Sequence, residues 1–292
     1  MPDLLERLAR GPALLLDGAT GTELERRGAA AALPLWSAQA LIDDPDLVGR
    51  IHAEYVAAGA DLLTANTFRT QQRTLSRADP RLRAADLTAQ AVALARRAAE
   101  AAGHRVWVLG SAPPLEDCFR PDRVPGDADL AREHAEHAQH LMAAGVDAIL
   151  LETMNTIREA VAAARAARAA GAAVLASFVC WDGATLLSGE ALGDAVSAVR
   201  EERVAAVLAN CLPPSNVAAC APVLRASGLP WGIYPNLGAP LDGGAGRRSE
   251  ECTPEAFAAH AAEWLDDGAR IVGGCCGTDP AQILAVAQRT RS

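Results

Sequence analysis

The chain has 292 residues, a length that fits either one closed α/β barrel or two average domains. Half of its residues are hydrophobic and 22% are charged, so it can bury a full core and is neither disordered nor fibrous. All 27 basic residues are arginine, and the absence of lysine excludes Schiff-base aldolases, pyridoxal enzymes and Walker-A phosphate loops. The net charge of −9 makes nucleic acids and anionic membranes poor partners and favours small ligands.

The N-terminal segment and the cysteine content both bear on the cellular compartment of the protein. The N-terminal segment MPDLLERLARG carries acids and an arginine inside its apolar part. No apolar stretch approaches the roughly 20 residues that a membrane-spanning helix needs. We therefore expect a cytoplasmic protein, in which the seven cysteines are thiols or metal ligands rather than a disulfide framework.

Short apolar runs rich in valine, isoleucine and leucine alternate with longer segments of helical period, which indicates repeated βα units and a parallel sheet. The runs cover residues 13–17, 61–66, 105–110, 147–152, 173–180, 204–211, 230–236 and 269–273. Because these runs are spread over the whole chain, they predict an α/β fold with one domain over residues 1–292, a (β/α)₈ TIM barrel rather than an open sheet.

Turn residues mark the ends of the expected helices. Thr20 or Thr22 is expected to cap the helix that follows the first strand, and Thr278-Asp279-Pro280 is typical of a cap followed by proline at the first helical position. Glycines that follow helical segments predict left-handed C-terminal caps. These glycines are Gly28, Gly59, Gly103, Gly145, Gly171 and Gly268.

Two connections are longer than ordinary turns. Residues 111–126 follow the third expected strand and residues 240–251 follow the seventh, and both segments are rich in proline, glycine and charge. Connections of this length are uncommon unless they serve a function. We therefore expect both to be lids.

In a barrel of this kind the active site lies at the C-terminal ends of the strands. Three cysteines fall at such positions: Cys211 after the sixth expected strand, and Cys275 and Cys276 after the eighth. Three converging thiolates favour zinc, and three protein ligands leave its fourth position open for a substrate or water. Gly273, Gly274 and Gly277 would permit the sharp turn that adjacent ligands need, although packed thiols or a vicinal disulfide remain open alternatives.

The segment DGATGT lies between the first strand and a helix, where the amides of Gly21 and Thr22 would point at a carboxylate or a phosphate. The lack of lysine and the flanking acids Asp17 and Glu23 favour a carboxylate. Glu152 closes a strand of isoleucine and leucine and suits an α-ammonium group. The residues alone also allow two alternatives without a ligand. DGATGT could be a tight turn, and Glu152 could be a buried glutamate bonded to backbone amides or to an arginine.

These residues resemble the homocysteine S-methyltransferases, a family of zinc-dependent barrels. The resemblance extends in order over nearly the entire chain, and the combination of GGCCGT with an upstream NC is its most specific part. The matching pieces are DGATGTELERRG at 17–28, LWSAQAL at 35–41, GADLLTANTF at 59–68, ETMNT at 152–156, NC at 210–211, YPN at 234–236 and GGCCGTDP at 273–280.

The resemblance implies that Cys211, Cys275 and Cys276 bind Zn²⁺ and that the sulfur of homocysteine takes the fourth position. A free thiol with a pKa of about 8.5 is mostly protonated at neutral pH. Binding to zinc removes the proton and holds the sulfur in place. Zinc would therefore activate a nucleophile, and transfer of a methyl group to it would give methionine.

The same resemblance implies how the substrates are held. Glu152 and the amides around Gly21 and Thr22 would bind the amino-acid end of homocysteine, while Asp17 and Asn210 support the pocket. Trp36, in the first long loop, is a candidate contact for the methyl donor. The expected substrate-binding residues are Asp17, Gly21, Thr22, Trp36, Asn66, Glu152, Asn210 and Tyr234.

Branches of the family differ in their methyl donor. The betaine-using branch places an aromatic residue after the strand-four glutamate, where this chain has Thr153, and the large cobalamin-dependent enzymes append domains for which no residues remain. A small sulfonium compound, S-methylmethionine or S-adenosylmethionine, is the expected donor. A further departure is Ala209, where members commonly carry glycine two residues before the ligating cysteine; we expect only a slightly different turn. The alternatives are betaine, a methylated corrinoid protein or folate as donor, or another thiol as acceptor.

Two hypotheses from other classes compete with this one: a barrel enzyme that binds phosphate at the strand-eight turn, and a non-catalytic zinc-binding thiol sensor. His134, His137 and His140 have a spacing that suggests a second metal patch, but their helix belongs to the outer ring, so we expect a solvated helix surface. Cys118 is expected near the pocket. The sequence gives no indication of the oligomeric state.

Overall fold

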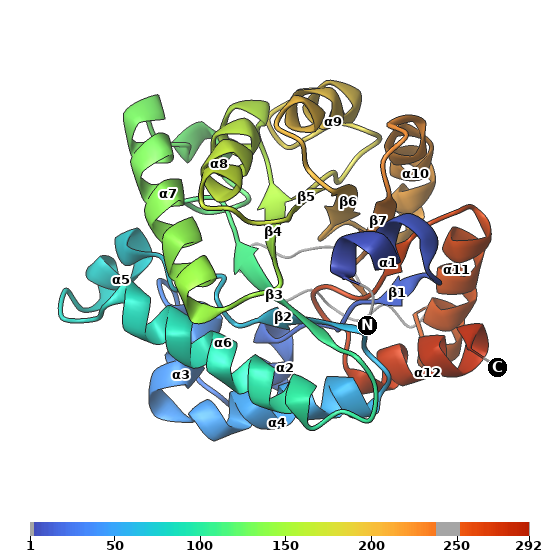
Figure 1. Ribbon diagram of the computed structural model, residues 1–292, viewed down its shortest axis with the longest axis horizontal. Coiled ribbons are helices and arrows are strands. Elements are labelled where there is room, and N and C mark those ends of the chain that lie inside the picture. The colour runs from blue at the N-terminus through green and yellow to red at the C-terminus, as the bar shows by residue number, and fades with distance from the viewer. Residues whose placement is uncertain (1–2, 238–251, 292) are drawn as a thin grey trace.

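The computed structural model describes residues 3–237 and 252–291, and it shows eight parallel strands surrounded by helices (Figure 1). The strands are β1 (Leu14–Leu15), β2 (Leu62–Ala65), β3 (Trp107–Ala112), β4 (Ala148–Met154), β5 (Val174–Phe178), β6 (Ala206–Asn210), β7 (Trp231–Tyr234) and β8 (Ile271–Val272). They pair in the order β1-β8-β7-β6-β5-β4-β3-β2. A parallel bridge between Leu16 and Leu62 joins the two ends of this order. The predicted (β/α)₈ barrel is confirmed.

Helices connect the strands and cover the outside of the barrel (Figure 1). Within the two described ranges they are α1 (Leu4–Arg10), α2 (Gly21–Arg26), α3 (Gln39–Asp43), α4 (Pro45–Ala57), α5 (Gln72–Ala78), α6 (Ala84–Glu100), α7 (Asp127–Ala144), α8 (Ile157–Ala169), α9 (Leu192–Glu201), α10 (Val217–Ala226), α11 (Pro254–Asp266) and α12 (Pro280–Thr290). Short 3₁₀ helices at Trp36–Ala38, Pro121–Arg123 and Pro214–Asn216 interrupt three of the loops.

The barrel wall is buried on both faces, which explains why its strands have continuous apolar runs rather than alternating ones. In β4, Leu150 packs inside the barrel with Leu109 and Leu208. Its neighbours Ile149 and Leu151 point the other way and pack in the cluster between the strands and the helices. The inside of the barrel is therefore a packed core and not a channel.

Helix α1 closes the N-terminal end of the barrel. Leu4 and Leu8 belong to the same buried cluster as the interior strand residues. The guanidinium group of Arg270, just before β8, donates hydrogen bonds to the backbone carbonyl groups of Leu8 and Gly11. With this end filled, the C-terminal ends of the strands are the place where the fold leaves room for ligands.

Most of the expected helix ends are found, and two are not. Asp279 caps α12, its carboxylate accepting a hydrogen bond from the Ala281 amide, with proline at the next position as predicted. Thr20 precedes α2 but its hydroxyl makes no capping bond. Gly103 lies in an irregular turn after α6 and has no left-handed backbone. The expected glycines that do have positive φ are Gly28, Gly59, Gly145, Gly171 and Gly268.

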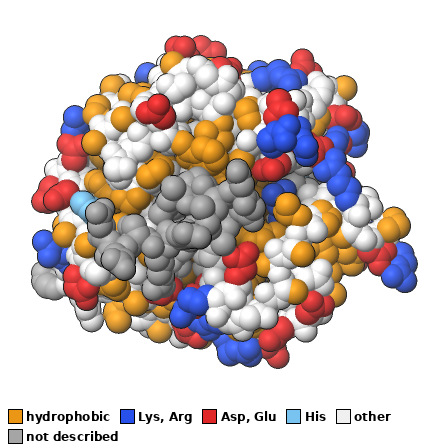
Figure 2. Space-filling view, turned by 180° about the vertical axis from the view of Figure 1, so that it is seen from behind, with side chains coloured by type: hydrophobic (Ala, Val, Ile, Leu, Met, Phe, Trp, Pro, Cys, Tyr) orange, Lys and Arg blue, Asp and Glu red, His pale blue; other side chains and the backbone are white. Residues whose placement is uncertain are grey.

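The surface and the long loops bear on the remaining expectations. On the face shown in Figure 2, acidic and basic side chains are interspersed among apolar ones. No helix within the described ranges is both long and apolar enough to cross a bilayer.

Of the two expected lids, the first begins later than predicted, because β3 continues to Ala112. The second, residues 240–251, lies outside the described residues, and both roles stay predictions.

The prediction that the histidines of α7 form a solvated surface is wrong for two of them. His134 and His137 are only 3% and 2% exposed, because they share the inward face of α7 with Leu130 and Leu141. The His134 ring nitrogen lies 3.2 Å from a carboxylate oxygen of Glu159. The His137 ring is packed against the backbone of β3. These side chains are therefore structural partners of the barrel wall.

Two histidines are expected to make the fold sensitive to acid. Burial lowers the pKa of His52 and of His137 to about 4. Because histidine in an unfolded chain has a pKa of about 6.5, the unfolded state gains protons between pH 6.5 and 4 that the folded state does not. The stabilisation is therefore complete above pH 6.5 and is lost as the pH falls. We expect each histidine to lower the free energy of unfolding by about 2 kcal/mol between pH 7.5 and pH 5.

Urea unfolding at several pH values measures this effect. Replacement of the fully buried His52 by glutamine is expected to make the unfolding free energy less dependent on pH, whereas the same change at the exposed His260 leaves the dependence as it is. Parallel pH profiles for wild type and His52→Gln would contradict the prediction.

Candidate active site and metal centre

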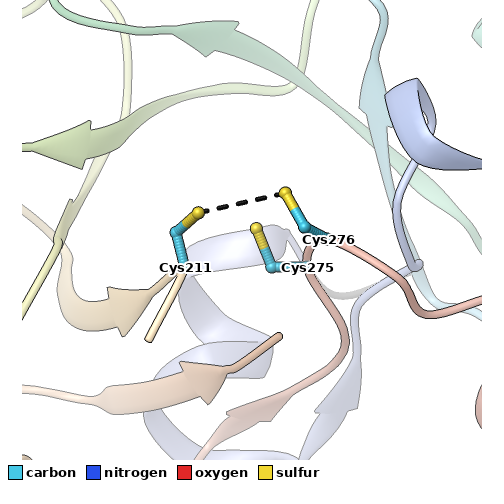
Figure 3. Close-up of side chains that lie close together, drawn as sticks. All are labelled: Cys211, Cys275 and Cys276. Atoms are coloured by element: carbon cyan, nitrogen blue, oxygen red, sulfur yellow. Dashed lines mark hydrogen bonds between the residues drawn. The ribbon is translucent and has the colours of Figure 1, made fainter. Parts of the chain in front are cut away.

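Three cysteine sulfurs meet at the C-terminal end of the barrel (Figure 3). The Sγ atoms of Cys211, Cys275 and Cys276 all lie within 4.8 Å of one another, and those of Cys211 and Cys276 are 3.9 Å apart. All three are free thiols, so the vicinal disulfide is not formed. Four ligands around zinc at a metal–sulfur distance of about 2.3 Å place sulfurs about 3.8 Å apart. The sulfur set therefore fits a tetrahedral metal ion.

The backbone is shaped to bring these sulfurs together. Cys211 directly follows β6 and has a left-handed backbone with φ 55°. Gly277 turns the chain after Cys276 with φ 85°. Gly273 and Gly274 are needed for a different reason, because a Cβ atom would lie 2.6 Å from the Leu16 Cβ and 2.3 Å from the Thr278 hydroxyl, respectively. Of the three glycines expected to permit the turn, only Gly277 contributes a left-handed conformation.

Asn210 ties the metal-ligand set to the neighbouring strands. Its carbonyl oxygen accepts hydrogen bonds from the Thr153 amide at 3.1 Å and the Ser177 hydroxyl at 2.7 Å. Its amide group donates to the Thr153 hydroxyl at 3.0 Å and to the Cys275 sulfur at 3.8 Å. Hydrogen bonds from Cys211, Cys276 and Asn210 hold the pKa of Cys275 well below its usual value. Cys275 is therefore the thiol of the set that ionises most readily, as a cation ligand must.

A cavity of about 550 Å³ opens above the sulfurs. Its walls come from the C-terminal ends of seven of the strands and the loops that follow them, with the aromatic side chains of Trp36, Phe68 and Phe119 among them. Of the expected site residues the cavity wall includes Asp17, Gly21, Trp36, Asn66, Glu152, Asn210, Cys211, Tyr234, Cys275 and Cys276. The structure thus gathers these residues from segments far apart in the sequence.

Thr22 is the expected residue that does not line the cavity. Its hydroxyl instead accepts a hydrogen bond from the Gly277 amide at 2.9 Å and so holds the turn that carries the cysteines. Gly21 does lie at the cavity, and a Cβ atom there would be 2.2 Å from the ring of Trp36. The indole of Trp36 therefore packs directly on Gly21, while its Nε1 donates to Glu25 at 3.0 Å.

Two acids face the cavity, the buried Asp17 and the partly buried Glu152, and each has its own partners. Asp17 accepts hydrogen bonds from the Thr64 amide at 2.7 Å and the Thr64 hydroxyl at 3.0 Å. Glu152 accepts one from the hydroxyl of Ser111, and no arginine of the described chain pairs with it. The pKa of Glu152 is raised to about 7, mainly by burial and also by the nearby Cys275 thiolate, while the Ser111 bond opposes the rise. Glu152 is therefore a partly buried acid that lacks a cationic partner among the described residues.

Sequence reasoning missed Ser111 and the backbone contact of Asn66. The expected third strand ended at residue 110, so Ser111 was placed in the loop that follows it. β3 in fact continues to Ala112, and a strand that long would have placed Ser111 among the polar residues at the strand ends. Asn66 was expected to bind substrate, yet its amide donates to the backbone oxygen of Ser37 at 2.9 Å, beside Trp36. Cys118 lines the cavity as expected but does not belong to the sulfur set.

Comparison with known proteins identifies the family. A family model described as homocysteine S-methyltransferase matches residues 14–290. The chain belongs to the homocysteine S-methyltransferase family. Homocysteine S-methyltransferase from Escherichia coli strain K12 is 33% identical, with 95% of each chain covered, and homocysteine S-methyltransferase YbgG from Bacillus subtilis strain 168 is 29% identical, with 96% and 95% covered.

Solved structures of the family agree with the architecture. The crystal structure of the metallated form of the homocysteine methyltransferase MmuM from Escherichia coli has a TM-score of 0.83 and 30% identity, and covers 97% of this chain and 98% of its own. Its metallated state and the sulfur set described here both favour a metal ion at this position. Residues that shape the site are accordingly expected to affect metal affinity.

Thr22 offers a test of how the cysteine turn is supported. Replacement by valine removes the acceptor of the Gly277 amide, and we expect metal affinity to fall by about 10-fold because the turn is less well held. Competition against a chelator of known affinity measures the change. Thr22→Ser keeps the hydroxyl and serves as the matched control; equal affinities for the valine variant and wild type would rule out this supporting role.

Proposed function

We propose that the protein transfers a methyl group from a small sulfonium donor, S-methylmethionine or S-adenosylmethionine, to the sulfur of homocysteine, with Zn²⁺ as its metal ion. The observation that carries the proposal is the set of three cysteine sulfurs within 4.8 Å of one another at a cavity that is also lined by Glu152, a partly buried acid without a cationic partner among the described residues. The family membership and the names of the relatives support homocysteine as the acceptor.

In this proposal Cys211, Cys275 and Cys276 hold the metal ion. When bound, Zn²⁺ supplies an open coordination position that favours the deprotonated form of a thiol and fixes its sulfur. Three anionic cysteine ligands keep the local charge negative, which preserves the electron density that a sulfur nucleophile needs. The Asn210 amide limits this charge only weakly, since it lies 3.8 Å from the Cys275 sulfur.

The remaining groups position the substrates. Glu152 is suited to the ammonium group of homocysteine, because a cation would remove the cost of its buried negative charge. The amides at the start of α2, near Gly21, are suited to the carboxylate. In the transfer, the donor's bond from sulfur to methyl breaks and a bond from the homocysteine sulfur to the same carbon forms. The acceptor thiol loses its proton, the donor becomes a neutral thioether, and methionine is the product.

The acceptor and donor are tested together with the metal. Purified protein is expected to contain one zinc ion per chain and to form methionine from homocysteine with S-methylmethionine or S-adenosylmethionine, but not with betaine, methyltetrahydrofolate or a methylated corrinoid protein. Cys275→Ser is expected to lose both zinc and activity. Cys220→Ser, a change at a buried cysteine of α10 outside the sulfur set, is the matched control. Full turnover by metal-free protein would refute the proposal.

Glu152 is tested through the acceptor's ammonium group. We expect Glu152→Gln to raise the KM for homocysteine by about 10- to 100-fold, because a charged hydrogen bond is lost, while the KM for the donor stays within about 3-fold. With 4-mercaptobutanoate, which lacks the ammonium group, wild type and variant should react equally poorly. Equal losses with both thiols would show that Glu152 acts on the pocket and not on the ammonium group.

A further inference from the structure

Arg69 lies in the wall of the active-site cavity and has no ion-pair partner among the residues that the structure describes. It follows Phe68 after the end of β2 and lines the same cavity as the three cysteines. Its side chain is half-buried, and no carboxylate in residues 3–237 or 252–291 forms an ion pair with it. The Nε atom is fully buried and has no hydrogen-bond partner in that part of the chain.

The other arginines of the cavity wall differ from Arg69. Arg77 binds the carboxylate of Glu116 through two hydrogen bonds of 2.6 and 2.7 Å. Arg123 is exposed, so water solvates its charge. Arg69 has neither full solvation nor a carboxylate partner within residues 3–237 and 252–291, although acids outnumber bases in this chain by 36 to 27. A charge that is partly removed from water without a counter-ion costs free energy, which an anionic ligand would recover.

The position of Arg69 is fixed by aromatic packing. Its guanidinium carbon lies 5.3 Å from the centroid of the Phe68 ring. Phe68 in turn packs edge-to-face on Trp36, with the ring centroids 5.9 Å apart. The guanidinium is thus held at the cavity wall before a ligand arrives, which reduces the entropy lost on binding. A planar guanidinium held in this way matches the two oxygens of a carboxylate.

We propose that Arg69 binds the carboxylate of an amino-acid methyl donor, an inference that rests on the proposed function. In the proposed function the ammonium group of homocysteine binds Glu152 on β4, and its carboxylate binds the amides at the start of α2. Arg69 lies elsewhere in the cavity wall, after β2 and next to Phe68, so it is free for the donor. Both expected sulfonium donors carry a carboxylate that needs a cationic partner. Arg69 is therefore a specificity-determining residue that favours donors with an anionic end over simple sulfonium ions.

The field of Arg69 reaches the loop beside the sulfur set. Its positive charge opposes the rise in the pKa of Cys118, which burial nevertheless raises to about 12. The Cys118 side chain lines the same cavity and is electrostatically coupled to Cys275. Arg69 and the three cysteines line one cavity of about 550 Å³, so a donor whose carboxylate is held by Arg69 would share this cavity with the acceptor.

The test compares S-methylmethionine with its amide, which keeps the sulfonium and the ammonium but lacks the negative charge. Arg69→Gln is expected to raise both the Kd, measured by calorimetry, and the KM for S-methylmethionine by about 10- to 100-fold. The KM for homocysteine should change by less than about 3-fold. For the amide, wild type and variant should be equal. Arg69→Lys keeps the charge without the planar fork and should show an intermediate loss.

Arg97→Gln removes the same charge from the exposed face of α6 and is the control for long-range electrostatic effects. An unchanged Kd for S-methylmethionine in Arg69→Gln, or an equal loss with the amide, overturns the inference. If wild type binds S-methylmethionine in an Arg69-dependent way but transfers a methyl group neither from it nor from S-adenosylmethionine, the proposed function fails and the Arg69 subsite stands. If wild type binds neither sulfonium donor, both fail.

Discussion

The pairing of β1 with β8 joins the two ends of the chain, and the site is built around this seam. Leu14 pairs with Ile271 and Leu15 with Val272. Beyond the paired residues, the Gly274 amide donates to the Asp17 carbonyl and the Ala19 amide donates to the Thr278 hydroxyl. A side chain at position 273 or 274 would separate these segments. The cysteine turn therefore has its shape because the last strand lies against the first.

The seam supplies two of the three sulfur atoms, and β6 supplies the third. The left-handed backbone at Cys211 directs its side chain toward the seam instead of along the strand. Asn210 links the seam to the neighbouring strand, since its side-chain amide contacts both the backbone of Thr153, the residue after Glu152, and the Cys275 sulfur. The segment that carries Glu152 and the set of three sulfurs are thus connected through a single side chain. In the proposed function this connection would couple the position of the acceptor to the geometry of the metal site.

Much of this could be predicted from the sequence, because strand-end polar residues and apolar runs follow directly from the geometry of a barrel. The eight runs matched the strands, and the cysteines after β6 and β8 met as expected. Features that depend on the direction of a side chain could not be predicted from the sequence pattern. The burial of His134 is set by which face of α7 meets the barrel, and the contact of Thr22 with Gly277 depends on the seam. An unpaired arginine is visible only when all its neighbours are known.

The separation of the three cysteines along the chain has a consequence for protein synthesis. Cys211 leaves the ribosome before β7 and β8, whereas Cys275 and Cys276 follow β8. The three sulfurs therefore cannot meet until β8 has emerged and paired with β1. Until this long-range pairing forms, the thiols of a nascent chain are open to oxidation or to capture of the wrong ion.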